Sequence, residues 1–341
     1  MARRVLALSS TMGGSRHLPS PDEGALLPGT LVSAYRVLGM VGVGGMGSVY
    51  RARHAITARI VAVKVLREDQ LEQDRAVDRM MREAAILATV QHPGIPRFAE
   101  CGLLDDGRPW IAMELLEGVP LSTRMQRGLV DPAEVADVVA GVASVLAAAH
   151  ARGVTHRDLK PDNIFLTPED PHARVRVIDW GIAHHLTGTR FTNVNEAIGT
   201  PTYMAPEQAR GGPTDGYCDV YGLGVVAYQA LTGRPPFIGA SSVEILVQHL
   251  NRPPPPLAPR CPDAPYGLVD LVERMLAKNF EERPTAAMVH QELSALSVRT
   301  AERGRERARE PSGDFPRPVI EANRTPPTAV IRAPRPDVFD E

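Results

Sequence analysis

The alternation of hydrophobic and polar positions divides the chain into a strand-rich first part and a helix-rich second part. Short Val-rich runs with partial alternation occupy residues 35–42, 47–54 and 59–66, and glycine or polar turns separate them. Such runs are typical of β-strands joined in an antiparallel meander. Apolar residues then recur at helical spacing over 74–90, and the sequence HPG follows. One helix is therefore predicted after the three strands.

The second part of the chain is predicted to be mainly helical. Two further strand-like runs, the second ending in WIAMELL at 110–116, come before it. Helical spacing of apolar residues then recurs over 131–152, 218–232, 241–250, 266–278 and 285–296. We therefore expect an α+β protein of two lobes: a small β-rich lobe with one main helix, and a larger, mainly helical lobe.

The two ends of the chain lack such a pattern. Residues 1–34 are rich in Gly, Ser and Pro without a sustained period, which predicts a flexible arm. Residues 298–341 contain nine arginines, eight acidic residues and seven prolines. A segment with so few large apolar residues cannot bury enough surface to offset its ordering entropy. We expect a disordered, Arg/Pro-rich tail.

Composition and charge narrow the range of partners. The chain has 341 residues and a net charge of −2, so bulk electrostatics give no reason to expect nucleic acid. Its three cysteines lack a CxxC pair, which supports neither a disulfide framework nor a zinc site. The apolar stretch of MARRVLALSS, about five residues, is shorter than a signal peptide needs. The longest apolar segment, 135–153, carries Asp137 and His150 and predicts a buried helix rather than a membrane span. We expect a cytoplasmic protein.

A glycine-rich turn is the first candidate for chemistry. Gly42, Gly44, Gly45 and Gly47 give the spacing GxGxxG within 42–47. A dinucleotide-binding fold would need a helix directly afterwards, but the strand-like SVYRA follows instead. The pattern then indicates a turn between two strands, whose backbone N–H groups can approach phosphates because no side chains intervene.

A lone lysine lies in an apolar strand seventeen residues after Gly47. It is Lys64 of VAVK, and a charge buried there needs a partner. Glu83 on the helix 74–90 is one candidate. For either residue taken alone, the favoured interpretation is a lysine that reaches solvent along its alkyl chain and a glutamate on a solvated face.

The strongest local signal is HRDLKPDN at 156–163, which follows the predicted buried helix. Asp158 can accept a hydroxyl proton, Lys160 can neutralise a phosphoryl group, and Asn163 offers a carbonyl oxygen to a hard cation. Sixteen residues after Asn163, a further apolar run ends in Asp179. That aspartate is either a metal ligand or the turn that closes a buried strand.

Taken in order, these motifs resemble the eukaryotic-like protein kinases, and in wording their bacterial serine/threonine (Hanks-type) branch. The set is GxGxxGxV (42–49), VAVK (61–64), Glu83, HRDLKPDN (156–163), DWG (179–181) and APE (205–207). The resemblance covers about residues 35–297. It implies an N-lobe at 35–113, a hinge at 114–118 and a C-lobe at 119–297.

By this resemblance, ATP lies between the lobes with the glycines 42–47 over its phosphates. Val49, Ala62 and Phe165 would surround the adenine, Met113 would be the gatekeeper, and the backbone from Glu114 to Leu116 would pair with the adenine edge. Lys64, held by Glu83, would bind the α- and β-phosphates, Asn163 and Asp179 would bind Mg²⁺ (Mn²⁺ is possible), and Asp158 and Lys160 would be catalytic.

The resemblance also implies structural and regulatory residues. Glu207 would pair with Arg283, and Asp219 would brace the catalytic loop. Arg157 would dock a phosphate of the activation loop, for which the candidates are Thr187, Thr189 and Thr192, and Thr200 would be a further regulatory residue. Self-association would allow this autophosphorylation in trans. Lys160-Pro161 and the Gly-Thr before YMAPE are similar to the serine/threonine pattern, which implies Ser/Thr-containing protein substrates.

One departure and two alternatives remain. Trp180 stands where the family usually has phenylalanine and must fit its larger ring against Leu87 and His156. A pseudokinase scaffold would normally lack one of Lys64, Asp158, Asn163 or Asp179. For a small-molecule phosphotransferase of related fold, GTPTYMAPE and the Arg283 match would be unexpected.

Overall fold

The structure is a computed structural model that describes residues 24–44, 47–71, 76–167, 170, 173–180, 201–212 and 214–296, without the side chain of residue 79. All of these belong to one compact unit, residues 1–300. Several predictions therefore lie outside the described residues: those for 1–23, Gly45, Gly181, Thr187, Thr189, Thr192, Thr200 and the tail 298–341.

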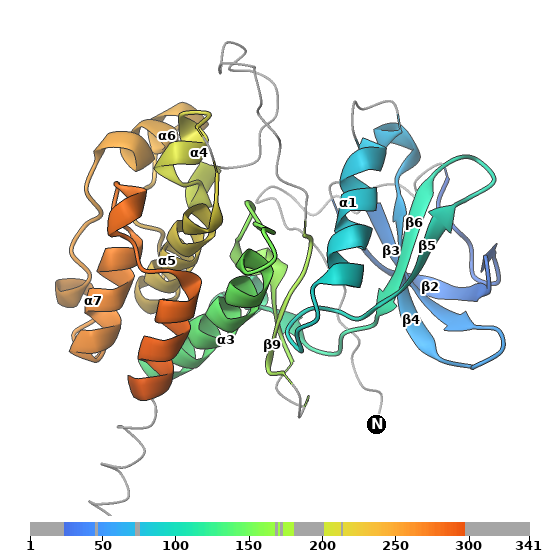
Figure 1. The fold of residues 1–341 in the computed structure, drawn as a ribbon, viewed down its shortest axis with the longest axis horizontal. Helices are drawn as coiled ribbons and strands as arrows, with labels where there is room; N and C mark the ends of the chain where they lie inside the picture. Colours follow the sequence, from blue (N-terminus) through green and yellow to red (C-terminus); the bar gives the residue numbers. More distant parts are fainter. Residues whose placement is uncertain are drawn as a thin grey trace, which may run out of the picture. The chain divides into compact units, whose positions relative to one another are not determined.

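The first part of the chain forms a six-stranded antiparallel sheet with the order β1-β2-β3-β4-β6-β5 (Figure 1). The strands are β1 (Leu31–Val32), β2 (Tyr35–Val43), β3 (Gly47–His54), β4 (Ile60–Leu66), β5 (Phe98–Leu103) and β6 (Pro109–Glu114). The predicted meander is confirmed in β2, β3 and β4. Burial alternates along the first part of β2, whereas β4 is buried on both faces.

Part of the segment expected as a flexible arm is ordered. Within 1–34, the structure describes 24–34, and the expectation is wrong there. β1 pairs antiparallel with β2, Val32 is fully buried, and the Leu26 amide donates to Tyr50 Oη at 3.1 Å. A two-residue strand is too short to show alternation, so only its pairing with β2 reveals it.

A single helix, α1 (Ala76–Thr89), packs on this sheet (Figure 1). Its buried face carries Met80, Ala84 and Leu87, which follow the spacing that predicted a helix over 74–90. The same face buries one charged residue, Glu83. The helix thus covers the inner side of the sheet and carries a carboxylate to it.

The second part is mainly helical, as predicted. It comprises α2 (Leu121–Met125), α3 (Pro132–His150), α4 (Pro206–Ala209), α5 (Gly216–Thr232), α6 (Ser242–Asn251), α7 (Tyr266–Met275) and a last helix over 286–296. Asp131 caps α3 by accepting a hydrogen bond from the Ala133 amide, and Asp215 caps α5 in the same way. The cap explains why α5 begins two residues before its predicted start.

Helix α3 lies in the core of this helical part. It is the one described helix that is long and apolar enough to cross a membrane. However, eight of its residues are buried, and it packs against α5 and β9 (Val175–Val177). The sequence prediction of a buried helix is therefore confirmed.

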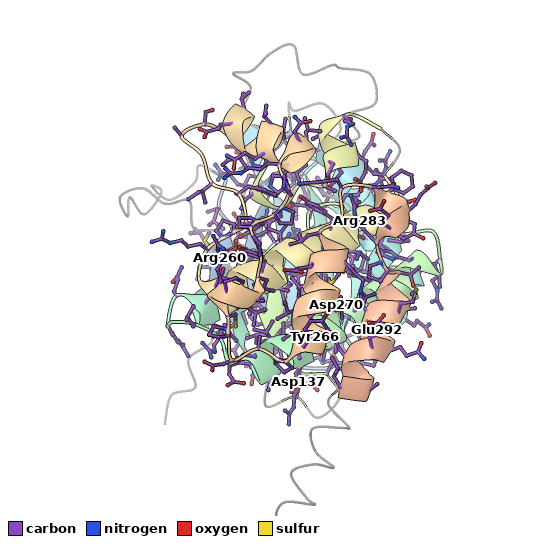
Figure 2. The ribbon with its side chains drawn as sticks, turned by 90° about the vertical axis from the view of Figure 1, so that its left-hand side faces the viewer. Asp137, Arg260, Tyr266, Asp270, Arg283 and Glu292 are labelled. Atoms are coloured by element: carbon purple, nitrogen blue, oxygen red, sulfur yellow. The ribbon has the colours of Figure 1, made fainter. Side chains whose placement is uncertain are left out.

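Ion pairs of exposed side chains connect α7 with the last helix. Arg274 donates to Asp270 one turn earlier at 2.9 Å and to Glu292 on the last helix at 3.3 Å. Figure 2 labels Asp270 and Glu292 on these two helices. All three side chains are more than a third exposed, so the bridge adds little to stability.

A small second sheet carries the loops that matter for chemistry. Its order is β7-β8-β9, with β7 (Val119–Pro120), β8 (Ile164–Leu166) and β9. The segment 156–163 leads into β8 through a short 3-10 turn, Pro161–Asn163, and Asp179 lies two residues after the end of β9. The sheet therefore brings the two motifs to the same end of one ladder. The strands β7 and β8 were not predicted, whereas a buried strand before Asp179 was one of the two interpretations of that residue.

Candidate active site

Lys64 of β4 and Glu83 of α1 form a buried ion pair. The Lys64 ammonium donates to both Glu83 carboxylate oxygens, at 3.0 and 2.8 Å. The two side chains are 8% and 4% exposed. The interpretation of a solvated lysine and a solvated glutamate is therefore wrong, because α1 packs its apolar face on the sheet and brings the carboxylate to the ammonium.

Asp179, which is distant in sequence, is the third member of this charged cluster. Its Oδ1 lies 2.8 Å from Lys64 Nζ, across 115 residues of sequence. Burial alone would lower the pKa of Lys64, but the charges of Asp179 and Glu83 outweigh it and raise that pKa. Burial would raise the pKa of Asp179, but Lys64 lowers it. Both groups are therefore charged near neutral pH.

Trp180 anchors the turn that presents Asp179. Asp179 has a φ of +60°, a conformation that costs a residue other than glycine roughly 1–3 kcal/mol. The Trp180 side chain is fully buried, its indole N–H donates to the Val177 carbonyl at 2.9 Å, and its ring meets His156 edge-on at 4.9 Å. The expected packing on His156 is confirmed, and the larger ring fits.

Asp219 of α5 braces the loop 156–163 as predicted. Its carboxylate accepts hydrogen bonds from the backbone amides of His156 at 2.8 Å and Arg157 at 2.7 Å. Arg157 has a φ of +67°, so these bonds hold a strained peptide in place. A third bond joins Asp219 to His150 of α3 at 2.8 Å, a contact that sequence reasoning missed.

Asp158, Lys160 and Asn163 converge within this loop. Lys160 Nζ lies 2.8 Å from Asp158 Oδ2, and Asn163 Nδ2 donates to the Asp158 carbonyl at 2.8 Å. The Asp158 side chain is 38% exposed, so another molecule can reach its carboxylate. Burial would lower the pKa of Lys160, but the Asp158 charge outweighs it and raises that pKa.

The side-chain oxygen atoms of Asn163 and Asp179 suit a hard cation that takes only two of its ligands from the protein. Asn163 and Asp179 lie at one end of the β8–β9 ladder, where the Ile178 amide donates to the Asn163 carbonyl at 3.0 Å. The side-chain amide nitrogen of Asn163 is used on Asp158, which leaves its side-chain oxygen as the possible ligand. No cluster of three or more His, Cys, Asp or Glu residues suited to a metal occurs in the described part of the chain. Two oxygen ligands suit a hard divalent cation that takes its other ligands from phosphates and water.

The residues expected around a nucleotide lie close to this cluster in the sheet register. Val49 pairs with Lys64, and Ala62 pairs with Met113. Phe165 in β8 is also buried. Met113, Glu114 and Leu116 lie in β6 and just after it, which places the expected hinge at the end of an inner strand of the sheet.

The glycines expected at the phosphate loop lie at the turn between β2 and β3, and the space around Gly47 leaves no room for a side chain. The Gly44 amide donates to the Gly47 carbonyl at 2.8 Å, which closes the turn between β2 and β3. A Cβ on Gly47 would lie 2.7 Å from the Val65 carbonyl oxygen, so a side chain there requires a backbone shift. Gly42 pairs with Val49 in the same hairpin.

A buried arginine at the hinge was not predicted. Arg176 of β9 is 3% exposed, and its guanidinium forms ion pairs with Asp170 and, at 3.3 Å, with Glu114. It also donates to the Pro93 carbonyl. A lone arginine in the apolar run VRVID is the same kind of signal as Lys64 in VAVK, and it could have been found in that way.

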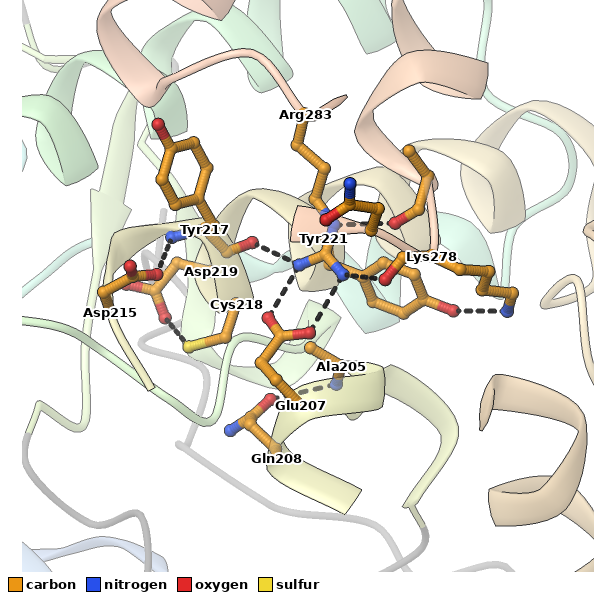
Figure 3. A network of polar contacts seen from close by, with 12 residues as sticks. Ala205, Glu207, Gln208, Asp215, Tyr217, Cys218, Asp219, Tyr221, Lys278 and Arg283 are labelled. Carbon is orange, nitrogen blue, oxygen red and sulfur yellow. Dashed lines mark hydrogen bonds and ion pairs between the residues drawn. The ribbon is translucent and has the colours of Figure 1, made fainter. Parts of the chain in front are cut away.

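Glu207 and Arg283 form the second buried ion pair that was expected (Figure 3). The two contacts between guanidinium and carboxylate measure 2.7 and 2.9 Å. Arg283 also donates to the carbonyls of Ala277 and Tyr217 at 2.7 and 3.0 Å. The guanidinium stacks on the Tyr221 ring at 4.8 Å. The pair ties α4 to α5 and to the segment before the last helix.

The chain matches the protein kinase domain family over residues 35–293. Serine/threonine-protein kinase pkn3 of Myxococcus xanthus is 39% identical over 79% of this chain and 50% of its own length. Serine/threonine-protein kinase PknA of Mycobacterium tuberculosis is 36% identical over 73% of this chain and 58% of its own length. The chain thus spans about half the length of these curated relatives.

The same family is found among solved structures. The crystal structure of the Mycobacterium tuberculosis PknI kinase domain matches with a TM-score of 0.64 and 29% identity, over 80% of this chain and 99% of that one. The β-rich and helical parts described above are those of the protein kinase fold. The chain therefore belongs to the protein kinase family, in its bacterial serine/threonine branch.

Proposed function

We propose that this chain is an ATP-dependent protein kinase that transfers the γ-phosphoryl group to serine and threonine hydroxyls of proteins. The observation that carries the proposal is the Asp158 carboxylate, which is open to solvent and lies 2.8 Å from the Lys160 ammonium. It belongs to the same end of the small sheet as Asp179, which contacts Lys64. This grouping of a base, two cations and a carboxylate supports a role in phosphoryl transfer.

In this proposal, Asp158 orients the acceptor hydroxyl and accepts its proton while the hydroxyl oxygen attacks the γ-phosphorus. The bond from phosphorus to the bridging oxygen breaks, and ADP leaves with that oxygen. Lys160 offsets the negative charge on the transferring group. Lys64, fixed by Glu83, binds the α- and β-phosphates.

Asn163 and Asp179 would hold Mg²⁺, and Mn²⁺ would also suit their oxygen atoms. The bound ion would neutralise charge on the phosphates. The role of Asp179 in the chain itself is to present a charged carboxylate at a fixed position, for which its contact with Lys64 and the buried Trp180 are the supporting observations.

Two observations support serine and threonine as the acceptor residues: the sequence of the loop 156–163 and the names of the matched relatives. Lys160-Pro161 follows HRDL, which resembles the serine/threonine pattern, and the matched relatives are named serine/threonine-protein kinases. The three cysteines are free thiols, which suits a reducing compartment. Together with the proposed use of ATP, this leads us to propose a cytoplasmic location. Protein substrates, and a second copy of the chain, are the proposed partners.

A transfer assay tests this function. The full chain is incubated with radiolabelled ATP, Mg²⁺ and three versions of one peptide that carry serine, threonine or tyrosine at a single position. We expect label on the serine and threonine peptides and none on the tyrosine peptide. Absence of label on any peptide and on the chain itself would refute the proposal, and labelled tyrosine would overturn the acceptor class.

We also expect the chain to phosphorylate itself, chiefly at Thr192 or Thr189. Arg157 adjoins Asp158, and its guanidinium lies 3.4 Å from the Thr214 carbonyl. A phosphothreonine carries about −1.5 to −2 charges and would compete for this cation. Mass spectrometry of active protein should locate phosphate between residues 187 and 200. The Asp158→Asn variant should lack it until it is mixed with active protein, and an active enzyme without phosphate in that segment would contradict the prediction.

A further inference from the structure

Arg176 of β9 is a buried cation whose presence packing alone does not explain. The residue is 3% exposed, and within the described residues its Nε atom is buried without a hydrogen-bond partner. Burying a guanidinium is costly, and apolar residues of similar volume in place of a buried ion pair often leave a protein at least as stable. The charge therefore indicates a role other than packing.

The guanidinium of Arg176 connects three segments that are distant in sequence. It donates to the Pro93 carbonyl in the connection between α1 and β5, and it forms an ion pair with Asp170 in the connection between β8 and β9. It also lies 3.3 Å from the Glu114 carboxylate at the end of β6. The strand β9 is itself fixed to the first connection, because the Val177 amide donates to a carbonyl there at 2.8 Å. Arg176 therefore contacts Glu114 from a position that is held on two sides.

A second arginine contacts the same carboxylate from the solvent side. The Glu114 carboxylate accepts a hydrogen bond from the backbone amide of Arg97 at 3.1 Å and lies 3.4 Å from the Arg97 guanidinium. The Glu114 amide in turn donates to the Arg97 carbonyl at 2.9 Å. The Arg97 side chain is 75% exposed, whereas that of Arg176 is 4% exposed. Since solvent screens the contact with the Arg97 guanidinium, Arg176 is the cation that governs the orientation of this carboxylate.

Glu114 lies where the sheet continues into the expected hinge. In the register of the sheet it pairs with Val61, next to the pair of Ala62 and Met113, two residues that are expected close to the adenine. A change in the orientation of Glu114 would therefore move the backbone that is expected to pair with the adenine edge. A binding segment that is already fixed in the free protein binds its ligand more tightly, because less ordering accompanies binding.

We propose that Arg176 is a positioning residue for the adenine base of the nucleotide. It fixes the end of β6 through the Glu114 carboxylate, and in this way it sets the affinity of the hinge for the base. This inference rests on the proposed kinase function, in which ATP is the phosphoryl donor. It concerns binding of the base alone, whereas the proposed role of Lys64 concerns the phosphates.

Binding of adenosine, which has the base but no phosphates, tests this role. Calorimetric titration of the full chain with ATP and Mg²⁺, and competition of adenosine against ATP, give the two dissociation constants. For Arg176→Met we expect both constants to rise by the same factor, about tenfold, which corresponds to one of the weaker hydrogen bonds to a charged group. Arg176→Lys keeps the charge and should recover most of the affinity. An adenosine affinity of Arg176→Met within twofold of the parent would overturn the inference.

Two control variants separate positioning from a general loss of stability. Arg108→Met removes another buried arginine, at the start of β6, which pairs with Asp106 at 2.7 Å and donates to the Gly24 carbonyl at 2.7 Å. It should lower the melting temperature and leave the adenosine affinity unchanged. Arg97→Ala removes the exposed arginine and should change that affinity by less than twofold. Equal losses of adenosine affinity in Arg108→Met and Arg176→Met would show a purely structural effect and overturn the inference.

A double-mutant cycle tests whether Arg176 acts through Glu114. Glu114→Gln keeps the size of the side chain but removes its charge, and we expect a loss of adenosine affinity similar to that in Arg176→Met. The variant with both changes should lose no more than either single variant, because two residues in direct contact that act as one unit are not additive. Additive losses would show that Arg176 does not act through Glu114 and would overturn the inference.

These binding measurements need no phosphoryl transfer, which separates the inference from the proposed function. A chain that binds adenosine with the expected changes but labels no peptide would refute the kinase proposal and support the role of Arg176. An active kinase whose adenosine affinity is the same in Arg176→Met would refute the role of Arg176 alone. A parent chain that binds neither ATP nor adenosine would overturn both.

Discussion

Replacing Asp158 by asparagine is expected to lower kcat for peptide phosphorylation by about 10²–10⁴-fold, the contribution typical of a positioned general base. Asparagine keeps the size of the side chain and the bond to Lys160, which lies 2.8 Å from Asp158 Oδ2. It cannot accept the hydroxyl proton. Since Lys64, Glu83 and Asp179 do not depend on Asp158, the affinity for ATP should be unchanged.

The same substitution at Asp162 is the matched control. Asp162 lies in the same loop, but its carboxylate accepts a hydrogen bond from Ser122 at 2.9 Å and has no part in the proposed proton transfer. Initial rates give kcat, and calorimetric titration gives the ATP affinity. Full-rate transfer by Asp158→Asn, or an equal loss in Asp162→Asn, would show that Asp158 is not the base.

Replacing Arg283 by alanine is expected to lower the free energy of unfolding by about 3–5 kcal/mol, the cost typical of removing one partner of a buried ion pair. The Arg283 side chain is inaccessible to solvent and the Glu207 side chain is 10% exposed, so the remaining carboxylate would be buried without its partner. The carbonyls of Ala277 and Tyr217 would also lose a donor.

The matched control for this prediction is Arg274→Ala on α7. Arg274 also forms an ion pair with a carboxylate, but the side chains of Arg274 and Glu292 are 38% and 39% exposed, which limits the expected loss to about 1 kcal/mol. Urea denaturation, followed by circular dichroism, measures both variants. Equal midpoints for the two variants would show that burial does not govern the strength of the Glu207–Arg283 pair.

The predictions from sequence were most accurate where the local pattern was long. β2, β3, β4 and α3 each extend over seven or more residues, enough for a period of two or 3.6 to appear. β1, β7 and β8 have two or three residues each and were missed. Such short strands hold too few positions to show a period, and their hydrogen bonds come entirely from neighbours that are distant in sequence.

The motifs predicted the ion pairs but did not show whether the charged side chains are buried or exposed to solvent. For Lys64 and Glu83, the same residues were compatible with two solvated charges, and only the packing of α1 on the sheet buried them. Arg176 and His249 were not singled out at all. Their partners, among them Glu114 for Arg176 and Tyr221 for His249, are 62 and 28 residues away, so no local pattern reports these contacts.

The sequence by itself determined the order of the longer strands and helices, the protein kinase family and the residue types available for phosphoryl transfer, because these depend on local periodicity and on short motifs. Tertiary structure alone decided that Lys64 meets Asp179 across 115 residues, and that Asp219 and Trp180 hold the positive-φ residues Arg157 and Asp179. The physical reason is that a buried charge or a strained peptide is stable only when distant parts of the chain supply its partners.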